Sequence, residues 1–208
     1  HQKGVKSVRT IVKHCAKIGV NTLTLFAFSS ENMNRPREEV GLLFKLFLTV
    51  LKNETKKLND NNIKLDIIGD LSVFTPEIQN HAEKAQQQLK KNTGLNVVIA
   101  ANYGGQWDIA EAAKKIATKA VKGEINPESI DKDIFGVHTS LAQYPRVDLL
   151  IRTSGEVRIS NFLLWDIAYS ELYFCDTLWP DFDANDLDIA INSFDSRYRR
   201  FGERNGEK

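Results

Sequence analysis

Apolar and polar residues follow two periods along the chain, one typical of helices and one typical of buried strands. In residues 4–18 apolar side chains recur at helical spacing, which predicts an amphipathic helix that ends at Gly19. Residues 20–28 are β-branched and apolar, which predicts a buried strand. Helix-like and strand-like segments then alternate, and this order predicts an α/β fold with a mainly parallel central sheet flanked by helices.

The remaining elements follow from the same periods and from the glycines and prolines between them. Helices are predicted after Pro36 and at residues 76–91, 107–121, 161–169 and 186–200, and strands at 63–68, 95–101, 147–151 and 172–175. No repeat, low-complexity tract or linker interrupts this order. Residues 1–208 are therefore expected to form a single domain.

Three of the predicted strands run directly into polar or glycine-rich segments. These segments are residues 29–35, 102–105 and 152–160. In open α/β sheets, ligands bind outside the carboxyl ends of the strands. The three segments are therefore expected to converge on one face.

The segment 152–160 carries two arginines and a hydroxyl just before a predicted helix, namely Arg152, Arg158 and Ser160. A guanidinium group offers a planar fork of donors that matches phosphate oxygens, and a helix N-terminus adds unpaired N–H groups. Together they suit a diphosphate. In the alternative interpretation one arginine pairs with Glu156 or Asp166, and Ser160 only caps the helix.

The segment 29–35 is a second polar cluster, with Ser29, Ser30, Glu31, Asn32 and Arg35. Because it follows a buried strand, its side chains are expected to face a cleft. The alternative is a helix-capping turn before Pro36.

Glu171 lies between a predicted helix and a short predicted strand. A partly buried carboxylate there could hold Mg²⁺, which prefers oxygen ligands and keeps substrate phosphates in its shell. The alternative is a surface glutamate or one paired with an arginine.

Residues 40–51 are apolar nearly all round, with Lys45 as the one charge. A helix that is apolar on more than one face is typical of a buried core. Such a helix could equally line a hydrophobic tunnel, and the pattern alone leaves both interpretations open.

Composition and charge narrow the class of protein. With 42% hydrophobic and 26% charged residues, the 208-residue chain is typical of a globular protein. A net charge of +1 gives no sign of a nucleic-acid partner. Cys15 and Cys175 have no metal-ligand spacing and favour a reducing compartment. Because no secretory signal or membrane-spanning run is visible, a cytoplasmic location is expected.

Taken in order, these clusters resemble the motifs of the cis-prenyltransferases, in particular the bacterial undecaprenyl diphosphate synthases. The resemblance rests on S-S-E-N-M-N-R-P at 29–36, N-Y-G-G at 102–105 with W-D at 107–108, and R-T-S-G-E-V-R-I-S-N-F at 152–162. It is extended by E-L-Y-F at 171–174 and W-P-D-F at 179–182. These motifs cover essentially the whole chain, to about residue 202.

The resemblance implies an enzyme that condenses isopentenyl diphosphate onto an allylic diphosphate such as farnesyl diphosphate, with cis geometry. The implied product is undecaprenyl (long-chain polyprenyl) diphosphate, a precursor of the lipid carrier for cell-wall polysaccharides. The resemblance also implies a homodimer, dependence on Mg²⁺, a hydrophobic tunnel and peripheral membrane contact for product release.

The resemblance also implies a role for each matching residue. Arg152, Arg158, Ile159 and Ser160 would bind isopentenyl diphosphate, and Glu171 would contact Mg²⁺. Asn32 would act in proton removal by orienting a water or a phosphate oxygen. Arg200 would reach the partner subunit's site. The remaining substrate-binding residues would be His1, Ser29, Ser30, Glu31, Met33 and Arg35.

This chain departs from the family pattern in a few places. The family's D-G-N-G-R-W loop, with a metal-binding aspartate, lies before His1 and is expected to be missing from this sequence. Met33, Gln106 and Val157 replace a usual tryptophan, a common arginine and a frequent histidine. A non-catalytic partner subunit of the same fold is the alternative function, but the intact segments 29–35 and 152–160 argue against it.

The tunnel implied by the resemblance leads to an expectation about product length. Leu95 and the helix at residues 40–51 are expected to set it.

Overall fold

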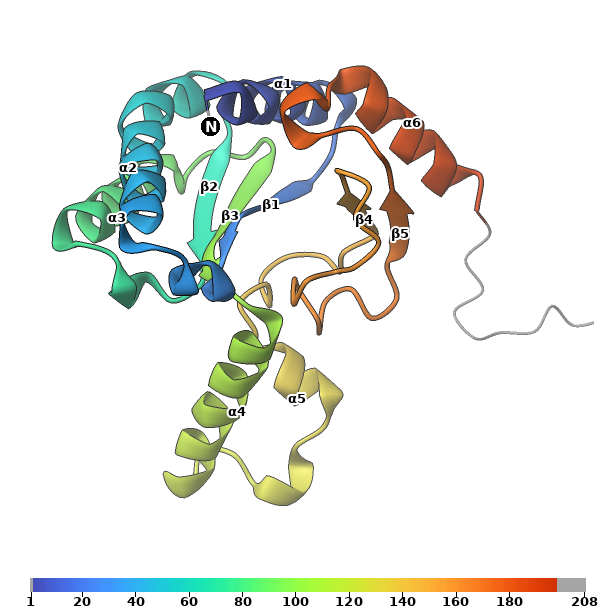
Figure 1. Ribbon diagram of the computed structural model, residues 1–208. Coiled ribbons are helices and arrows are strands. Elements are labelled where there is room, and N and C mark those ends of the chain that lie inside the picture. The colour runs from blue at the N-terminus through green and yellow to red at the C-terminus, as the bar shows by residue number, and fades with distance from the viewer. Residues whose placement is uncertain (1, 198–208) are drawn as a thin grey trace, which may run out of the picture.

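The computed structural model describes residues 2–197 and confirms the α/β architecture, with five strands in that part of the chain. The strands form two parallel sheets that are not hydrogen-bonded to each other. Figure 1 shows the two sheets side by side beneath α1, with β1 and β4 facing each other across the gap between them.

The larger sheet has the strand order β1-β3-β2, with β1 (Thr22–Ser29), β3 (Asn96–Tyr103) and β2 (Lys64–Ile68). Thr22 and Lys64 are both level with Asn96, so all three strands start together. The central strand β3 is the most buried, with Val98 and Ala100 fully enclosed. Because the strands are parallel, their carboxyl ends meet at the same edge.

The smaller sheet pairs β4 (Leu149–Arg152) with β5 (Glu171–Phe174). Leu149 is level with Glu171, and Arg152 is level with Phe174. This register places Arg152 and Glu171 at opposite ends of the sheet.

Helices cover both sheets. Helix α1 (Gln2–Ile18) buries Ile11, Val12 and Cys15, the stripe that the helical period predicts. Helices α2 (Arg37–Asp60) and α3 (Pro76–Leu89) pack beside each other against the larger sheet. Helix α6 (Ala184–Asp195) is joined to α1 by a 2.6 Å contact between His14 Nε2 and Asp188 Oδ1.

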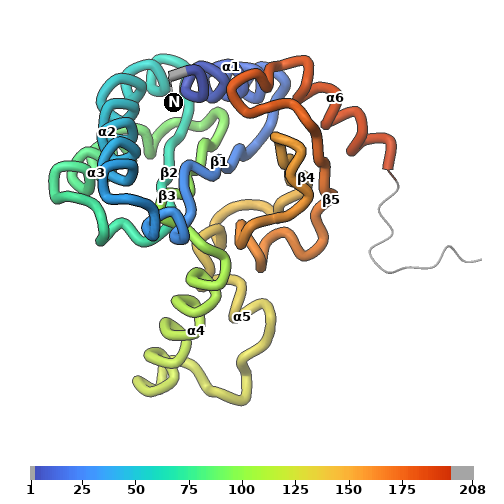
Figure 2. The backbone as a smooth tube through the Cα atoms, viewed as in Figure 1, coloured from blue at the N-terminus to red at the C-terminus, as the bar shows by residue number. Residues whose placement is uncertain are grey.

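Helices α4 (Gly105–Val121) and α5 (Lys132–Gly136) project away from the two sheets, as the backbone tube in Figure 2 also shows. Both follow the carboxyl end of β3 in the chain. The start of α4 is therefore tied to the edge at which the strands of the larger sheet end.

One predicted helix is wrong. Residues 161–169 form consecutive turns and no helix. Ser160, Asn161 and Leu163 have φ values of 48°, 60° and 45°, in the left-handed region. A right-handed helix cannot begin through residues in that conformation. The predicted final helix is confirmed from its start at Ala184, while residues 198–200 lie outside the described part of the chain.

The apolar segment in α2 is less enclosed than its composition suggests. Within it only Phe47 and Leu51 are buried, and Leu42 is 59% exposed. The other apolar side chains are partly accessible. The segment is therefore not a helix buried on all sides.

Candidate active site

The carboxyl ends of β1 and β3 lie side by side, as the sequence predicts. Ser29, the last residue of β1, is level with Tyr103, the last residue of β3. The short helix η1 (Ser30–Asn34) follows β1, and α4 follows β3. Two of the three predicted segments are therefore brought together by the register of the sheet.

The third segment is joined to the other two by Asn161. Its side-chain Nδ2 donates a 2.6 Å hydrogen bond to Glu31 Oε1, and its Oδ1 accepts a 2.9 Å bond from the Gln106 backbone N–H. Its backbone carbonyl accepts a 2.6 Å bond from Gly105 N–H. One asparagine therefore contacts both the segment after β1 and the start of α4.

This junction requires a glycine at position 104. A Cβ on Gly104 would lie 2.7 Å from Ser30 Oγ and 2.8 Å from Asn161 Nδ2. Both distances are shorter than a normal van der Waals contact, so a larger residue would push the two side chains apart. The double glycine is thus explained by the close approach of the three segments.

The segment after β1 is organised by its own side chains. Ser29 N–H donates a 3.0 Å hydrogen bond to Asn32 Oδ1, and Ser30 Oγ donates to Glu31 Oε2 at 3.2 Å. The pKa of Glu31 lies below its usual value, chiefly because Asn161 donates to it, with a backbone hydrogen bond adding to the effect. Glu31 is therefore ionised at neutral pH.

Arg35 and Met33 lie at the outer part of this segment. Arg35 Nη1 pairs with Glu39 Oε1 at 2.6 Å, one turn along α2. The two side chains are 47% and 43% exposed, so water competes for this pair and it is weak. Met33 is half-buried.

Arg152 has a buried side-chain donor, Nε, without a hydrogen-bond partner among the described residues. Arg152 closes β4 and is half-buried. A buried unpaired donor is costly, which indicates a place for an anionic ligand.

Arg158 and Ser160 sit differently from what the sequence predicts. Arg158 Nη1 pairs with Glu156 Oε2, as in the alternative interpretation, and its side chain is 64% exposed. Ser160 has left-handed backbone and does not cap a helix. The predicted anion site therefore combines Arg152, from the end of β4, with loop side chains, and it lacks the predicted helix N-terminus. Ile159 is half-buried and packs on the core.

Glu171 is not brought next to Arg152. It lies three residues before the level of Arg152 along the paired strands, about 10 Å at the usual rise per residue. Its Oε2 accepts a 2.9 Å hydrogen bond from Arg197 Nη1. Within residues 2–197 no group of three or more histidine, cysteine, aspartate or glutamate side chains could hold a metal ion.

A buried carboxylate network supports the start of α4. Asp108 is 2% exposed and accepts hydrogen bonds from Tyr103 Oη at 2.8 Å and from Ser140 Oγ at 2.7 Å. Asp166 lies near it, with a buried Oδ2 that has no hydrogen-bond partner among the described residues. Burial, together with the Asp108 charge, raises the pKa of Asp166 to about 6. Sequence analysis considered Asp166 only as a partner for an arginine and Asp108 only as part of a motif, so the proximity of the two carboxylates was not predicted.

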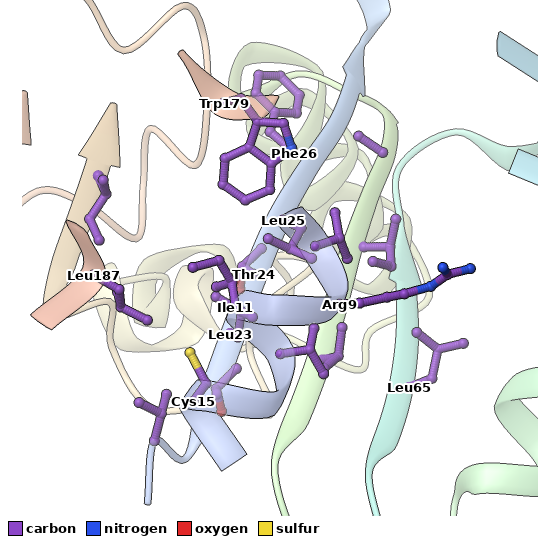
Figure 3. A pocket seen from close by; sticks show the side chains of 18 of the residues that line it. Arg9, Ile11, Cys15, Leu23, Thr24, Leu25, Phe26, Leu65, Trp179 and Leu187 are labelled. Atoms are coloured by element: carbon purple, nitrogen blue, oxygen red, sulfur yellow. The ribbon is translucent and has the colours of Figure 1, made fainter. Parts of the chain in front are cut away.

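A cavity of about 1210 Å³ lies between the two sheets. Figure 3 shows side chains such as Leu23, Leu25 and Trp179 around it. Its lining includes Arg152 at the carboxyl end of β4 and Ile159 in the segment that follows, and it follows the chain from residue 21, just before β1, to residue 28. That stretch spans about 23 Å. The cavity is thus long, mainly apolar and bordered at one end by the arginine segment.

Helix α2 forms one wall of this cavity, which accounts for its incomplete burial. The lining residues from its apolar segment are Leu43, Leu46, Phe47, Val50 and Leu51. Leu42, on the outer face, is not among them. The tunnel-wall interpretation of this helix thus agrees with the geometry better than the core interpretation.

The structure does not support the expectation that Leu95 sets product length. Leu95 is 4% exposed in the core and does not line the cavity, whereas Val97 and Ile99 do. Leu95 directly precedes Asn96, the first residue of β3, and so lies outside the strand.

Two predicted site residues, His1 and Arg200, lie outside the described residues. No helix in the described part of the chain is long and apolar enough to cross a bilayer.

Comparison with known proteins places these features in a family. A family model described as "Putative undecaprenyl diphosphate synthase" matches residues 1–202. The chain is 52% identical over 202 residues to a ditrans,polycis-undecaprenyl-diphosphate synthase, (2E,6E)-farnesyl-diphosphate specific, from Vibrio cholerae. The match covers 97% of this chain and 81% of that protein. A protein of the same description from Escherichia coli K12 is 50% identical, with 97% and 80% covered.

Two solved structures have the same fold. The crystal structure of lavandulyl diphosphate synthase from Lavandula x intermedia, in complex with dimethylallyl diphosphate, superposes with a TM-score of 0.93. It is 38% identical, with 98% of this chain and 88% of that chain covered. A probable undecaprenyl diphosphate synthase from Campylobacter jejuni gives a TM-score of 0.87 at 30% identity, covering 98% and 93%.

Proposed function

We propose, since the chain belongs to the undecaprenyl diphosphate synthase family of cis-prenyltransferases, that it condenses isopentenyl diphosphate repeatedly onto farnesyl diphosphate. The proposed product is undecaprenyl (long-chain polyprenyl) diphosphate, the lipid-carrier precursor for cell-wall polysaccharides. The observation that carries the proposal is the mainly apolar cavity that has Arg152 in its lining and follows β1 from Thr22 to Phe28. A diphosphate at the arginine end would leave the hydrocarbon chain inside the cavity.

Arg152, Arg158, Ile159 and Ser160 are the proposed isopentenyl diphosphate site. The buried Nε of Arg152 supports this role, because a phosphate oxygen would supply its missing acceptor. The ion pair of Arg158 with Glu156 is exposed, and a diphosphate can displace it at small cost.

Residues 29–35 are the proposed allylic site, with His1 and Arg35 on the diphosphate. Because Asn32 Oδ1 already accepts from Ser29 N–H, we assign its Nδ2 to orienting a phosphate oxygen or a water during proton removal. Loss of the allylic diphosphate leaves positive character on carbon and negative charge on the leaving group. Donors stabilise the leaving group, and the apolar walls keep water from the carbon centre.

The proposed reaction includes a divalent cation. Mg²⁺ is held by one or two carboxylates together with substrate phosphates, and it would neutralise diphosphate charge. Glu171 is the carboxylate that the family pattern assigns to it, but its hydrogen bond to Arg197 would first have to break.

We further propose that residues 1–208 act as one domain within a homodimer, in which Arg200 reaches the partner's site. We also propose a cytoplasmic location with peripheral membrane contact, because the substrates are water-soluble diphosphates and the product is a lipid.

The test is incorporation of radiolabelled isopentenyl diphosphate by the protein expressed from its gene, with farnesyl diphosphate and MgCl₂. Long-chain product that disappears on addition of EDTA is the expected result. A protein that binds both diphosphates but makes no product under any metal would instead be a non-catalytic subunit of the same fold, and the proposal would be wrong.

A further inference from the structure

We propose that Asn161 is a positioning residue that holds the allylic segment (residues 29–35) and the start of α4 in register with the arginine segment (residues 152–160). This inference rests on the proposed function, since it concerns how the two substrate sites of that reaction are kept aligned. Asn161 neither lines the cavity nor belongs to a strand pair, and its contacts are with the segment after β1 and the start of α4.

The contacts of Asn161 use each of its polar side-chain groups once. Nδ2 donates to Glu31 Oε1, and Oδ1 accepts from Gln106 N–H. An aspartate would lose the donor and would place a second negative charge against Glu31. A larger amide would not fit beside Gly104, whose own Cβ position is already 2.8 Å from Asn161 Nδ2. Asparagine is the side chain that satisfies both neighbours in this space.

The backbone of Asn161 also fits this role. Its φ of 60° is left-handed, a region that asparagine tolerates better than most residues. The same conformation turns its carbonyl towards Gly105 N–H, at 2.6 Å. Two hydrogen bonds from different parts of one residue therefore fix the start of α4 against the arginine segment.

This arrangement matters because the two substrates react with each other. Glu31 and Asn32 belong to the proposed allylic site, whereas Ser160 next to Asn161 belongs to the isopentenyl diphosphate site. Rates fall steeply when reacting groups are misplaced by about 1 Å. A residue that joins the two segments therefore acts on catalysis without touching either substrate.

Three variants separate the contacts of Asn161. Asn161→Gly removes the side chain while keeping the left-handed backbone. Asn161→Asp keeps the acceptor for Gln106 N–H but repels Glu31. The double variant Glu31→Gln with Asn161→Asp restores the hydrogen bond with donor and acceptor exchanged.

We expect Asn161→Gly to lower kcat/KM for both substrates by about tenfold or more, the effect of losing a hydrogen bond to a charged group. Asn161→Asp is expected to be worse, and the double variant to regain part of that loss. Because Nδ2 no longer stabilises the Glu31 carboxylate in Asn161→Gly, the acid limb of the kcat/KM profile should move to higher pH. Hydrogen exchange at Gln106 N–H should become faster in the substrate-free protein.

Asn62 provides a matched control. It also has left-handed backbone, with a φ of 55°, and its side chain makes two hydrogen bonds, both to Thr93. It lies just before β2, at the end of the sheet away from the site. Asn62→Gly should cost stability but leave kcat/KM and the pH profile unchanged.

Two results would overturn the proposal. One is Asn161→Gly with the same kinetics and pH profile as Asn62→Gly. The other is a double variant no better than Asn161→Asp alone, a comparison that holds even if Asn161→Gly folds poorly. Inactivity of the unaltered protein would be a failure of the proposed function, and the exchange rate at Gln106 N–H would still test the junction.

Discussion

At the scale of single residues, Arg152 carries the clearest prediction. Its buried Nε has no acceptor among the described residues, so a bound diphosphate would satisfy it. We expect Arg152→Ala to raise KM for isopentenyl diphosphate about 10- to 100-fold, the effect of losing about 1.5–3 kcal/mol of charge-assisted hydrogen bonding. Steady-state kinetics at saturating farnesyl diphosphate would measure it.

Arg146 is the matched control for Arg152. It precedes β4, at the opposite end of the strand, and its exposed side chain also lines the cavity, so the two variants compare the two ends of the same lining. Arg146→Ala should leave that KM unchanged. An unaltered KM in Arg152→Ala would show that the diphosphate is bound elsewhere.

Asp166 leads to a prediction about stability and pH. Burial first, and the Asp108 charge second, raise its pKa from 3.8 to about 6. Between about pH 4 and pH 6 the folded protein therefore holds a proton that the unfolded chain has lost. The free energy of unfolding should fall as the pH rises through this window, by about 1–2 kcal/mol after allowance for partial exposure.

Asp166→Asn should remove this dependence and raise the free energy of unfolding at pH 7 by a similar amount. Urea unfolding at pH 4, 5, 6 and 7 would measure both effects. Asp133→Asn, at an exposed carboxylate of α5, is the control and should keep the slope. An identical slope in Asp166→Asn would mean that Asp166 titrates normally in the folded protein.

At the scale of elements, helix α2 is predicted to limit product length. Leu46 lines the cavity, whereas Leu42 lies on the outer face of the same helix. A tryptophan at position 46 would fill cavity volume that the growing chain needs. We expect Leu46→Trp to shorten the product and Leu42→Trp to leave it unchanged, as measured by mass spectrometry of the extracted lipids. Equal products from both variants would place the chain elsewhere.

The sequence predicted the elements well where one period ran uninterrupted. Helix α1 and strands β1 and β3 have a regular spacing of apolar residues, and glycines or polar residues follow them. The proximity of residues 29–35 to residues 102–105 could therefore be predicted. The helix at 161–169 could not be excluded, because its apolar spacing is satisfied by turns. The left-handed backbone at Ser160 and Asn161 depends on contacts with Glu31 and Gly105, which are far away in the sequence.

In the candidate site, too, contacts between residues distant in the sequence could not be predicted. The motifs predicted that Arg152 and the segment after β1 belong to the site. Asn161 is also part of a motif, but the motif assigns no role to it. Its role depends on three-dimensional contacts with residues more than fifty positions away in the chain. Strand alternation would place Leu95 on the same face as Val97 and Ile99, which line the cavity. Leu95 precedes the strand and is buried in the core, so it is not part of the lining, and the sequence pattern could not show this.

At the scale of the whole molecule, the cavity separates two sheets that share no hydrogen bonds. Side chains from β1 and β4 line it from different sheets. A hydrocarbon chain bound in the cavity would contact side chains of both sheets and would hold the two sheets together by apolar packing. A ligand with a diphosphate and a long apolar tail should therefore stabilise the molecule as a unit, whereas inorganic diphosphate should act only on the loops.

This difference can be measured by thermal unfolding and hydrogen exchange. At about 100 times its Kd a ligand adds about 2.7 kcal/mol, which corresponds to a rise in Tm of about 5–10 °C for a chain of this size. At matched saturation, farnesyl diphosphate should slow exchange in both β1 and β4, and inorganic diphosphate only in the loop residues of the two proposed diphosphate sites, 30–35 and 153–160. Leu46→Trp should weaken the first effect and spare the second. If farnesyl diphosphate protected the loops alone, the hydrocarbon would lie outside the cavity, and the gap between the sheets would not be the path of the product.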